Sequence, residues 1–217
     1  MNKYMCSLLI CFALWAAVSS SAFSQQQIPP ESLDKLQNIF ADVRDRLWEV
    51  NDEFWHSGEY ERCIATMRLI VQIDPHDIDA YDNTAWLMQN DFRDEEAEAF
   101  LKEGLANNTD RYDMYFNLGY FLYMHERYDE AVQFLTMATA FDPPNFVWHS
   151  LAHAYEHAGR TTEALDLWAT RIQAEPDDPV ATNQFNRMLK GGPQSDTPAM
   201  MSRWREERKR LEKGIEN

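Results

Sequence analysis

The sequence predicts an all-α protein, an α-solenoid of about four helix-turn-helix repeats with a further helix on each side. Three observations indicate this fold class. A pattern of apolar and small residues recurs every 33 or 34 residues. Within each unit, apolar residues follow the i, i+3, i+4, i+7 spacing of an amphipathic helix. Glycine is scarce, with 7 in 217 residues, which favours helices over a sandwich or barrel.

The repeat is clearest in the second half of the chain. The third unit contains the series Tyr115, Leu118, Gly119, Leu122, Tyr128, Ala131, Leu135, Ala138 and Pro143, and the fourth contains Trp148, Leu151, Ala152, Tyr155, Thr161, Ala164, Trp168, Arg171 and Pro176. Small residues let paired helices approach closely, and proline ends the second helix because it cannot continue one. A single unit cannot cover its own apolar face, so the units are expected to stack into a right-handed solenoid.

The spacing, the small residues and the closing proline together resemble the tetratricopeptide repeat family over residues 44–178. The repeats that the resemblance implies are 44–77, 78–111, 112–144 and 145–178. Three residues depart from the family pattern. Asn51 and Arg171 stand where a small residue is usual, and Thr84 is a weak core residue. Any local distortion of the repeats is expected at these positions.

Further segments flank the array. Residues 1–24 have a positive start, an apolar run of 13 residues and small residues before Gln25. We predict a secretory signal peptide, because a spanning helix needs roughly 20 apolar residues. An uncleaved anchor and a lipid anchor on Cys11 are the alternatives. The remaining predicted segments are an N-terminal segment with a leading helix over 25–43, a capping helix over 179–190, a linker over 191–196 and a basic amphipathic C-terminal helix over 197–217.

The charge and cysteine content of the chain exclude several classes of partner and of cysteine chemistry. The net charge is −16, and it becomes −17 without the signal peptide, which carries Lys3 and no acidic residue. Nucleic acid is therefore not expected as a partner, because phosphate contacts need a basic surface. No membrane span is expected after cleavage. The mature chain keeps one cysteine, Cys63, which cannot form an internal disulfide; its place in an apolar stripe predicts a buried side chain rather than a nucleophile.

In the family that this chain resembles, one side of each first helix lines a concave groove. Carried over repeat by repeat, the predicted groove residues are Asp45, Trp48, Asp52, Trp55, Asp79, Asp82, Trp86, Gln89, Asn90, Asp113, Phe116, Tyr120, Tyr123, Met124, Phe146, His149, His153 and Glu156. This surface is aromatic and acidic, so we predict a protein partner, a peptide or helix of basic or apolar character. The alternative is that several of the rings pack between neighbouring helices.

Histidines suggest a second kind of ligand. His149, His153 and His157 follow one another at i, i+4 and i+8, and two imidazoles one helical turn apart can share a divalent ion. The alternative is three polar groove residues. No catalytic motif appears in the sequence, so neither an enzyme nor a cofactor is expected.

The sequence thus predicts an exported, non-catalytic scaffold or adaptor, in the periplasm first and the extracellular space second. The alternative function is small-ligand binding, by a metal on the three histidines or a sugar on the groove aromatics. The C-terminal helix carries Arg203, Arg205 and Arg208 among its basic residues. One hypothesis is that this helix docks on an acidic groove, its own or a neighbour's, and docking on a neighbour's groove would cause self-association. A solvated, mobile terminal helix is the alternative.

Overall fold

The computed structural model describes residues 29–193, together with residues 206, 209 and 210. The predicted signal peptide over 1–24 lies outside this range, as does the predicted C-terminal helix over 197–217 apart from those three positions. Within the described residues the chain forms helices joined by short turns and no strand, which confirms the all-α prediction. None of the described helices is both long enough and apolar enough to cross a membrane.

The helices occur where the periodicity places them. Their bounds are α2 Pro30–His56, α3 Tyr60–Ile73, α4 Ile78–Asn90, α5 Asp94–Asn107, α6 Tyr112–Met124, α7 Tyr128–Thr139, α8 Asn145–His157, α9 Thr161–Ala174 and α10 Pro179–Leu189. The leading helix and the first helix of the array are continuous in α2. Helix ends depend on local features of the sequence, namely amphipathic spacing, turn residues and closing prolines.

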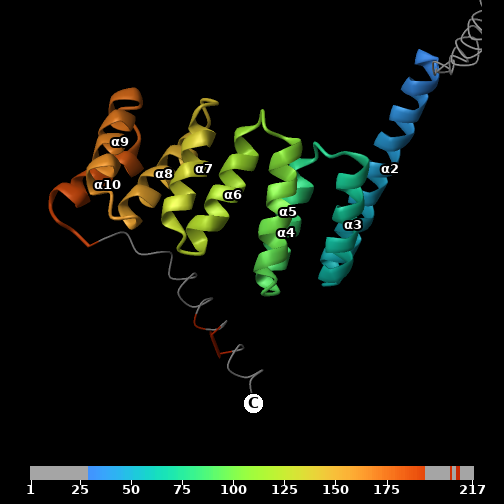
Figure 1. The fold of residues 1–217 in the computed structure, drawn as a ribbon, viewed down its shortest axis with the longest axis horizontal. Helices are drawn as coiled ribbons and strands as arrows, with labels where there is room; N and C mark the ends of the chain where they lie inside the picture. Colours follow the sequence, from blue (N-terminus) through green and yellow to red (C-terminus); the bar gives the residue numbers. More distant parts are fainter. Residues whose placement is uncertain (1–28, 194–205, 207–208, 211–217) are drawn as a thin grey trace, which may run out of the picture. The chain divides into compact units, whose positions relative to one another are not determined.

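The described chain divides into two units, one ending at Ala41 and one beginning at Asp42. The first contributes the N-terminal half of α2, where every described residue is exposed. In the second unit, α3 to α10 follow one another in chain order (Figure 1), and each helix packs against the next. The first helices of successive repeats also touch, α4 with α6 and α6 with α8, so their side chains share one surface.

Small residues bring the paired helices together, as the repeat pattern predicts. A Cβ atom on Gly119 of α6 would lie 2.9 Å from Cγ of Leu135 on α7. A Cβ atom on Gly104 of α5 would lie 2.7 Å from Cγ of Tyr81 on α4. Real contacts of a Cβ atom are essentially never this short, so both positions need glycine for the helices to pack closely.

The turn inside each repeat uses one residue in the left-handed region. These residues are Gly58, Phe92, Glu126 and Gly159, with φ of 72°, 61°, 61° and 76°. The next residue donates its backbone N–H to the carbonyl five residues earlier, as in Arg127 N to Leu122 O at 3.0 Å. This is a Schellman motif, in which glycine is usual because a Cβ atom is disfavoured at positive φ.

We predict that Glu126→Gly raises the free energy of unfolding by about 0.5–1 kcal/mol, because it removes strain at a positive φ. The matched substitution Gly159→Ala, at the equivalent turn of the next repeat, should lower it by a similar amount. A Cβ atom on Gly159 would have no heavy atom within 4 Å, so backbone conformation is the dominant effect there. Urea denaturation measures both changes. If both substitutions changed the free energy of unfolding in the same direction, backbone strain at positive φ would not be the dominant effect at these two turns.

The residues that depart from the family pattern do not interrupt their helices. Asn51 and Thr84 are buried, at 7% and 0% exposure, within continuous α2 and α4. Arg171 reaches out of α9 to Glu175 at 2.8 Å, and its guanidinium carbon lies 5.1 Å from the centre of the Trp148 ring. A long side chain therefore replaces a small one here by lying along the surface of the neighbouring helix.

Candidate functional site

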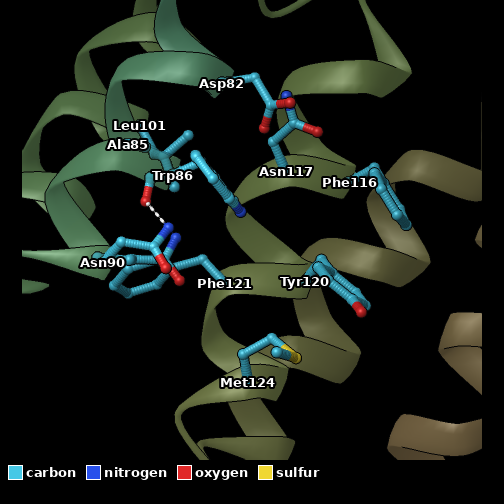
Figure 2. Close-up of a pocket in the computed structure, with 11 residues that line it drawn as sticks. Asp82, Ala85, Trp86, Asn90, Leu101, Phe116, Asn117, Tyr120, Phe121 and Met124 are labelled. Atoms are coloured by element: carbon cyan, nitrogen blue, oxygen red, sulfur yellow. Dashed lines mark hydrogen bonds between the residues drawn. The ribbon is translucent and has the colours of Figure 1, made fainter. Parts of the chain in front are cut away.

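The main candidate site is a pocket of about 480 Å³ between the first helices of the second and third repeats. We call it the α4–α6 pocket. Its lining residues are Asp82, Ala85, Trp86, Gln89 and Asn90 from α4, Leu101 from α5, and Phe116, Asn117, Tyr120, Phe121 and Met124 from α6. Figure 2 shows side chains of α4 and α6 converging on it. The pocket forms where α4 and α6 contact each other, and the buried Leu101 of α5 also lines it.

The pocket combines a buried apolar floor with exposed rings. Ala85, Leu101 and Phe121 are buried, at 3% exposure or less. Trp86 and Tyr120 are instead 52% and 39% exposed. An exposed indole is unusual for a structural residue, and aromatic side chains provide large contact areas at low conformational entropy cost.

Aromatic clusters continue from both walls of the pocket. On the α4 side, the Trp86 ring lies 5.9 Å from Trp55, which lies 5.6 Å from Tyr60. On the α6 side, Phe116 lies 5.6 Å from Tyr120 and 5.0 Å from Phe146. The rings on these two sides come from four successive repeats, so the surface is longer than one pocket.

Asp82 supplies negative charge at the pocket. Loss of hydration around its carboxylate raises the pKa of Asp82, and the nearby carboxylate of Asp79 raises it further. Among the described residues no cation is within ion-pair distance of Asp82. Asp82 is itself an exposed residue, so its carboxylate is open to a bound cation, which would stabilise its charged form.

Many of the predicted groove residues lie together on this surface. The α4–α6 pocket includes the predicted residues Asp82, Trp86, Gln89, Asn90, Phe116, Tyr120 and Met124. A neighbouring pocket of about 350 Å³ includes Trp48, Asp52 and Trp55, beside Asn51, Met67 and Asn83. Phe146 is exposed and joins the same surface through its contact with Phe116.

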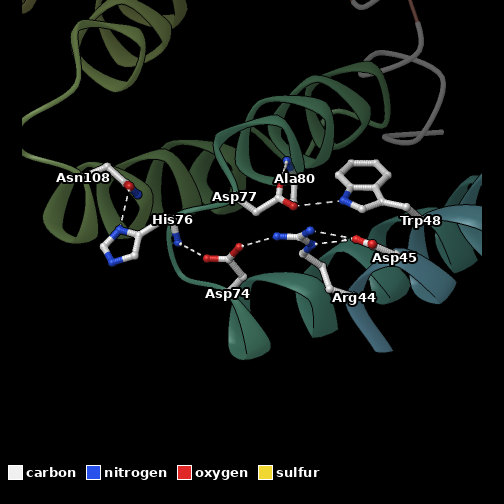
Figure 3. Close-up of polar contacts among 8 residues, drawn as sticks. All are labelled: Arg44, Asp45, Trp48, Asp74, His76, Asp77, Ala80 and Asn108. Carbon is white, nitrogen blue, oxygen red and sulfur yellow. Dashed lines mark hydrogen bonds and ion pairs between the residues drawn. The ribbon is translucent and has the colours of Figure 1, made fainter. Parts of the chain in front are cut away.

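Two predicted groove residues, Trp48 and His149, bond to residues of the following helix pair or capping helix. The indole nitrogen of Trp48 donates to Oδ2 of Asp77, at 2.9 Å, and Asp77 also caps α4 by accepting from the backbone N–H of Ala80 (Figure 3). The last repeat has the same arrangement, because Nε2 of His149 lies 2.6 Å from Oδ2 of Asp178, the residue that caps α10. In both cases a side chain from one repeat holds the start of the next first helix or of the capping helix.

The capping carboxylate of the last repeat is well stabilised. Burial alone would raise the pKa of Asp178, but the backbone N–H of Ala181 and the side chain of His149 outweigh it, so the pKa lies below its ordinary value. Bonds to the charged form thus compensate for the lost hydration.

Three further predicted residues pack against side chains of α7 to α10. Tyr123 is 8% exposed and contacts the rings of Tyr128 and His157. Glu156 pairs with Arg187 of α10 at 2.6 Å. The ring centre of His153 lies 5.3 Å from that of Trp168. Tyr123 of α6 is thus covered by side chains of α7 and α8, whereas Glu156 and His153 of α8 contact side chains of α10 and α9.

The predicted acidic residues Asp79 and Asp113 lie in the first turns of α4 and α6, and Asp45 lies in the middle of α2. Asp45 pairs with Arg44 at 2.8 Å, and Asp113 pairs with Arg111 at 3.1 Å. Asp79 and Asp113 line a separate pocket of about 320 Å³ together with both arginines. In the same region Arg44 bonds Asp74, and His76 bonds Asn108 (Figure 3). The two arginines therefore neutralise only part of the negative charge of this region, which also contains Asp77 and Asp79.

The three histidines predicted as metal ligands have separate environments. His149 contacts Asp178, His153 lies against Trp168, and His157 stacks on Tyr128 with 5.0 Å between ring centres. Burial lowers the pKa of His153 to about 4, so its imidazole is neutral at pH 7. Within the described residues no group of three or more His, Cys, Asp or Glu side chains could hold a metal ion. The metal site stays a prediction without geometric support.

Sequence reasoning missed four residues of the pocket: Ala85, Leu101, Asn117 and Phe121. Asn117 had a detectable signal. Asn83 stands 34 residues before it, at the equivalent position of the preceding repeat, and lines the neighbouring pocket. The same polar residue type at one repeat position on adjacent helices indicates a shared surface. The three apolar residues had no such signal, because their spacing is that of any core position.

These features define an α-solenoid of stacked helical pairs with an exposed aromatic surface on its first helices. Residues 89–146 match the family model described as tetratricopeptide repeat. The fold is similar to that of the Pseudomonas aeruginosa protein PilF, with TM-score 0.57 and 21% identity over 70% of each chain. It is also similar to a thermophilic TPR protein of Thermus thermophilus, with TM-score 0.53 and 18% identity over 72% of this chain and 90% of that one.

A third similar structure is YrrB, described as a TPR protein with an unusual peptide-binding site, with TM-score 0.52 and 14% identity over 71% of this chain and 85% of that one. No curated protein matches the chain by sequence. The low identities establish a common fold, and the site must be argued from this chain's own residues.

Proposed function

We propose that this protein is a non-catalytic interaction scaffold that binds a segment of a partner protein in the α4–α6 pocket and on the flanking rings. One observation carries the proposal: Trp86 is half exposed beside Asp82, which has no cationic partner among the described residues. Stacked repeats hold such a surface rigidly, so little ordering is required when the partner binds. The peptide-binding site named for YrrB shows that this fold can serve such a role in another protein.

The proposed partner segment has basic and apolar side chains. An apolar side chain would fill the space between Trp86 and Tyr120 above the floor at Phe121. A Lys or Arg side chain would pair with Asp82 and could lie over the indole of Trp86, where a cation is attracted to the ring face. The protein's net charge of −16 would attract a basic partner at longer range.

We further propose that binding takes place outside the cytoplasm, in the periplasm, because residues 1–24 have the features of a secretory signal peptide. Fractionation of cells that express the full chain with a C-terminal tag tests this proposal. Recovery of an unprocessed chain in the cytoplasm would contradict it.

The partner's character can be tested with peptides in which Leu alternates with Arg, compared with the same peptides carrying Glu in place of Arg. Isothermal titration of residues 25–217 should give about tenfold tighter binding of the basic peptide. Asp82→Asn should remove most of this preference. The matched substitution Glu103→Gln, on an exposed residue of α5 outside the pocket, should leave it unchanged. Equal binding of both peptides, or equal effects of both substitutions, would argue against the proposed partner.

A sugar is the second candidate ligand, for one specific reason. The α4–α6 pocket places the side chains of Asp82, Gln89, Asn90 and Asn117 around the exposed ring of Trp86. Amide and carboxylate groups bond sugar hydroxyls, and an aromatic ring can stack on the apolar face of a sugar. A glycan array probed with the wild type and with Trp86→Ala distinguishes the two ligands, since only a sugar site would give binding there that depends on Trp86.

A further inference from the structure

The N-terminal half of α2 presents an apolar stripe. Leu33, Leu36, Ile39 and Phe40 are 44%, 44%, 55% and 46% exposed, and we call these four residues the α2 stripe. All described residues from 29 to 41 are exposed. A helical segment of this length gains little stability from intrinsic propensity alone, since most helical stability in proteins comes from packing an apolar face. The stripe therefore calls for a partner surface.

The spacing of the stripe specifies what kind of partner fits. Counted along α2, apolar residues alternate at intervals of three and four: Leu33, Leu36, Phe40, Val43, Leu47, Val50 and Phe54. This is the a and d pattern of a heptad repeat over three heptads. Such a seam packs against another helix, because each side chain inserts between four side chains of a parallel neighbour. Leu33, Leu36 and Phe40 thus suit a helical partner better than a flat surface.

The residues that flank the α2 stripe indicate which kind of helix can pair with it. With Leu33 at position a, the flanking e and g positions of residues 30–41 are Pro30, Ser32, Gln37 and Ile39, all uncharged. The charged residues fall on the outer face, where Lys35 pairs with Glu31 at 2.7 Å. Residues at e and g select the partner helix through their charges.

Neutral flanks are compatible with a second copy of the same helix, in spite of the strongly acidic composition of the chain. A basic helix, such as the one predicted over residues 197–217, would find no carboxylate at these flanking positions. The charge pattern therefore favours pairing between identical segments over docking of the basic tail. An isologous contact of this kind is also the commonest way in which soluble proteins form dimers.

We infer that residues 30–41 of α2 pair with the same residues of a second copy as a two-stranded coiled coil, so that the protein is a homodimer. The interface uses Leu33, Leu36 and Phe40 as its seam, with Ile39 at its edge. A dimer carries two aromatic grooves, and a partner with two recognised segments would gain avidity without any new contact. The dimer does not depend on what the grooves bind.

Sedimentation equilibrium of residues 25–217 between about 1 and 200 µM tests this inference, a range that covers weak protein dimers. The wild type should dimerise with increasing concentration. The double substitution Leu36→Glu with Phe40→Glu should raise the dissociation constant about tenfold or more, because four carboxylates would meet in an apolar seam. The control Asn38→Glu with Ala41→Glu adds the same charge at outer positions f and b and should leave the constant unchanged. Circular dichroism should show equal helix content in all three proteins.

Several outcomes would overturn the inference. A wild type that stays monomeric over the whole range would do so, as would equal weakening by both double substitutions. A chain that ends at residue 193 tests which of two segments packs on the α2 stripe, a second copy of α2 or the C-terminal segment. An unchanged dimer supports pairing of the α2 stripe, whereas loss of the dimer would show that the C-terminal segment is the occupant. Trp86→Ala should keep the dimer intact, so failure of the proposed groove and failure of the dimer are distinguishable.

Discussion

Trp86→Ala is expected to weaken partner binding by about 30-fold or more, which corresponds to about 2 kcal/mol, the size of a binding hot spot. The indole lies on one wall of the α4–α6 pocket and contacts Trp55, so its removal affects both the pocket and the adjoining aromatic cluster. Isothermal titration with the Leu–Arg peptide, or with a partner captured in cells, measures this loss.

The same substitution should change stability little, by about 1 kcal/mol or less, because the ring is 52% exposed and a half-exposed side chain contributes less than a core one. The control is Met137→Ala, which removes a side chain of 49% exposure from α7, outside the pocket. Equal losses of affinity for the two variants would show that the aromatic surface is not the binding site.

Trp168→Ala is expected to produce the largest loss of stability, about 3–5 kcal/mol, as for other large core side chains. The side chain is fully buried and belongs to a core cluster with Ala152 and Ala181, which joins α8, α9 and α10. This cluster is distinct from the main core, which extends from α3 into α8. Urea denaturation followed by circular dichroism gives the total change.

The loss should also be localised. In a stacked array each repeat contacts its neighbours only, so α8 to α10 should lose hydrogen-exchange protection while α3 to α6 keep most of theirs. Trp168→Phe retains most of the volume and should be less destabilising. A uniform loss of protection along the whole chain would indicate that the array unfolds as one cooperative unit.

The sequence was sufficient for the fold because its signals are local. Apolar spacing within a few turns predicts where α3 to α9 run, and Pro75, Pro143 and Pro176 mark where second helices stop. The turns could be placed as well, although their left-handed residue is glycine only at Gly58 and Gly159. The repeat period also shows which residues of successive helices are equivalent, which the apolar spacing of a single helix cannot show.

The binding surface could be predicted only in part. Three of the residues predicted from the family resemblance, Trp86, Tyr120 and Phe116, line one pocket. The resemblance could not separate them from Tyr123, which lies on the same helix as Phe116 and Tyr120, α6, but is covered by the rings of Tyr128 and His157. Nor could it show that Trp48 and His149 bond the residues that cap the following first helix and α10.

The amino-acid sequence by itself determined the helices, their pairing into repeats and the acidic, aromatic character of the first-helix surface. Only the tertiary structure decided which of those rings remain open to solvent, that Asp82 has no cationic partner among the described residues, and that the three histidines are engaged separately. The physical reason is that helix formation depends on neighbours a few positions away, whereas exposure and charge pairing depend on side chains contributed by the adjoining repeat, about 30 residues distant in the chain.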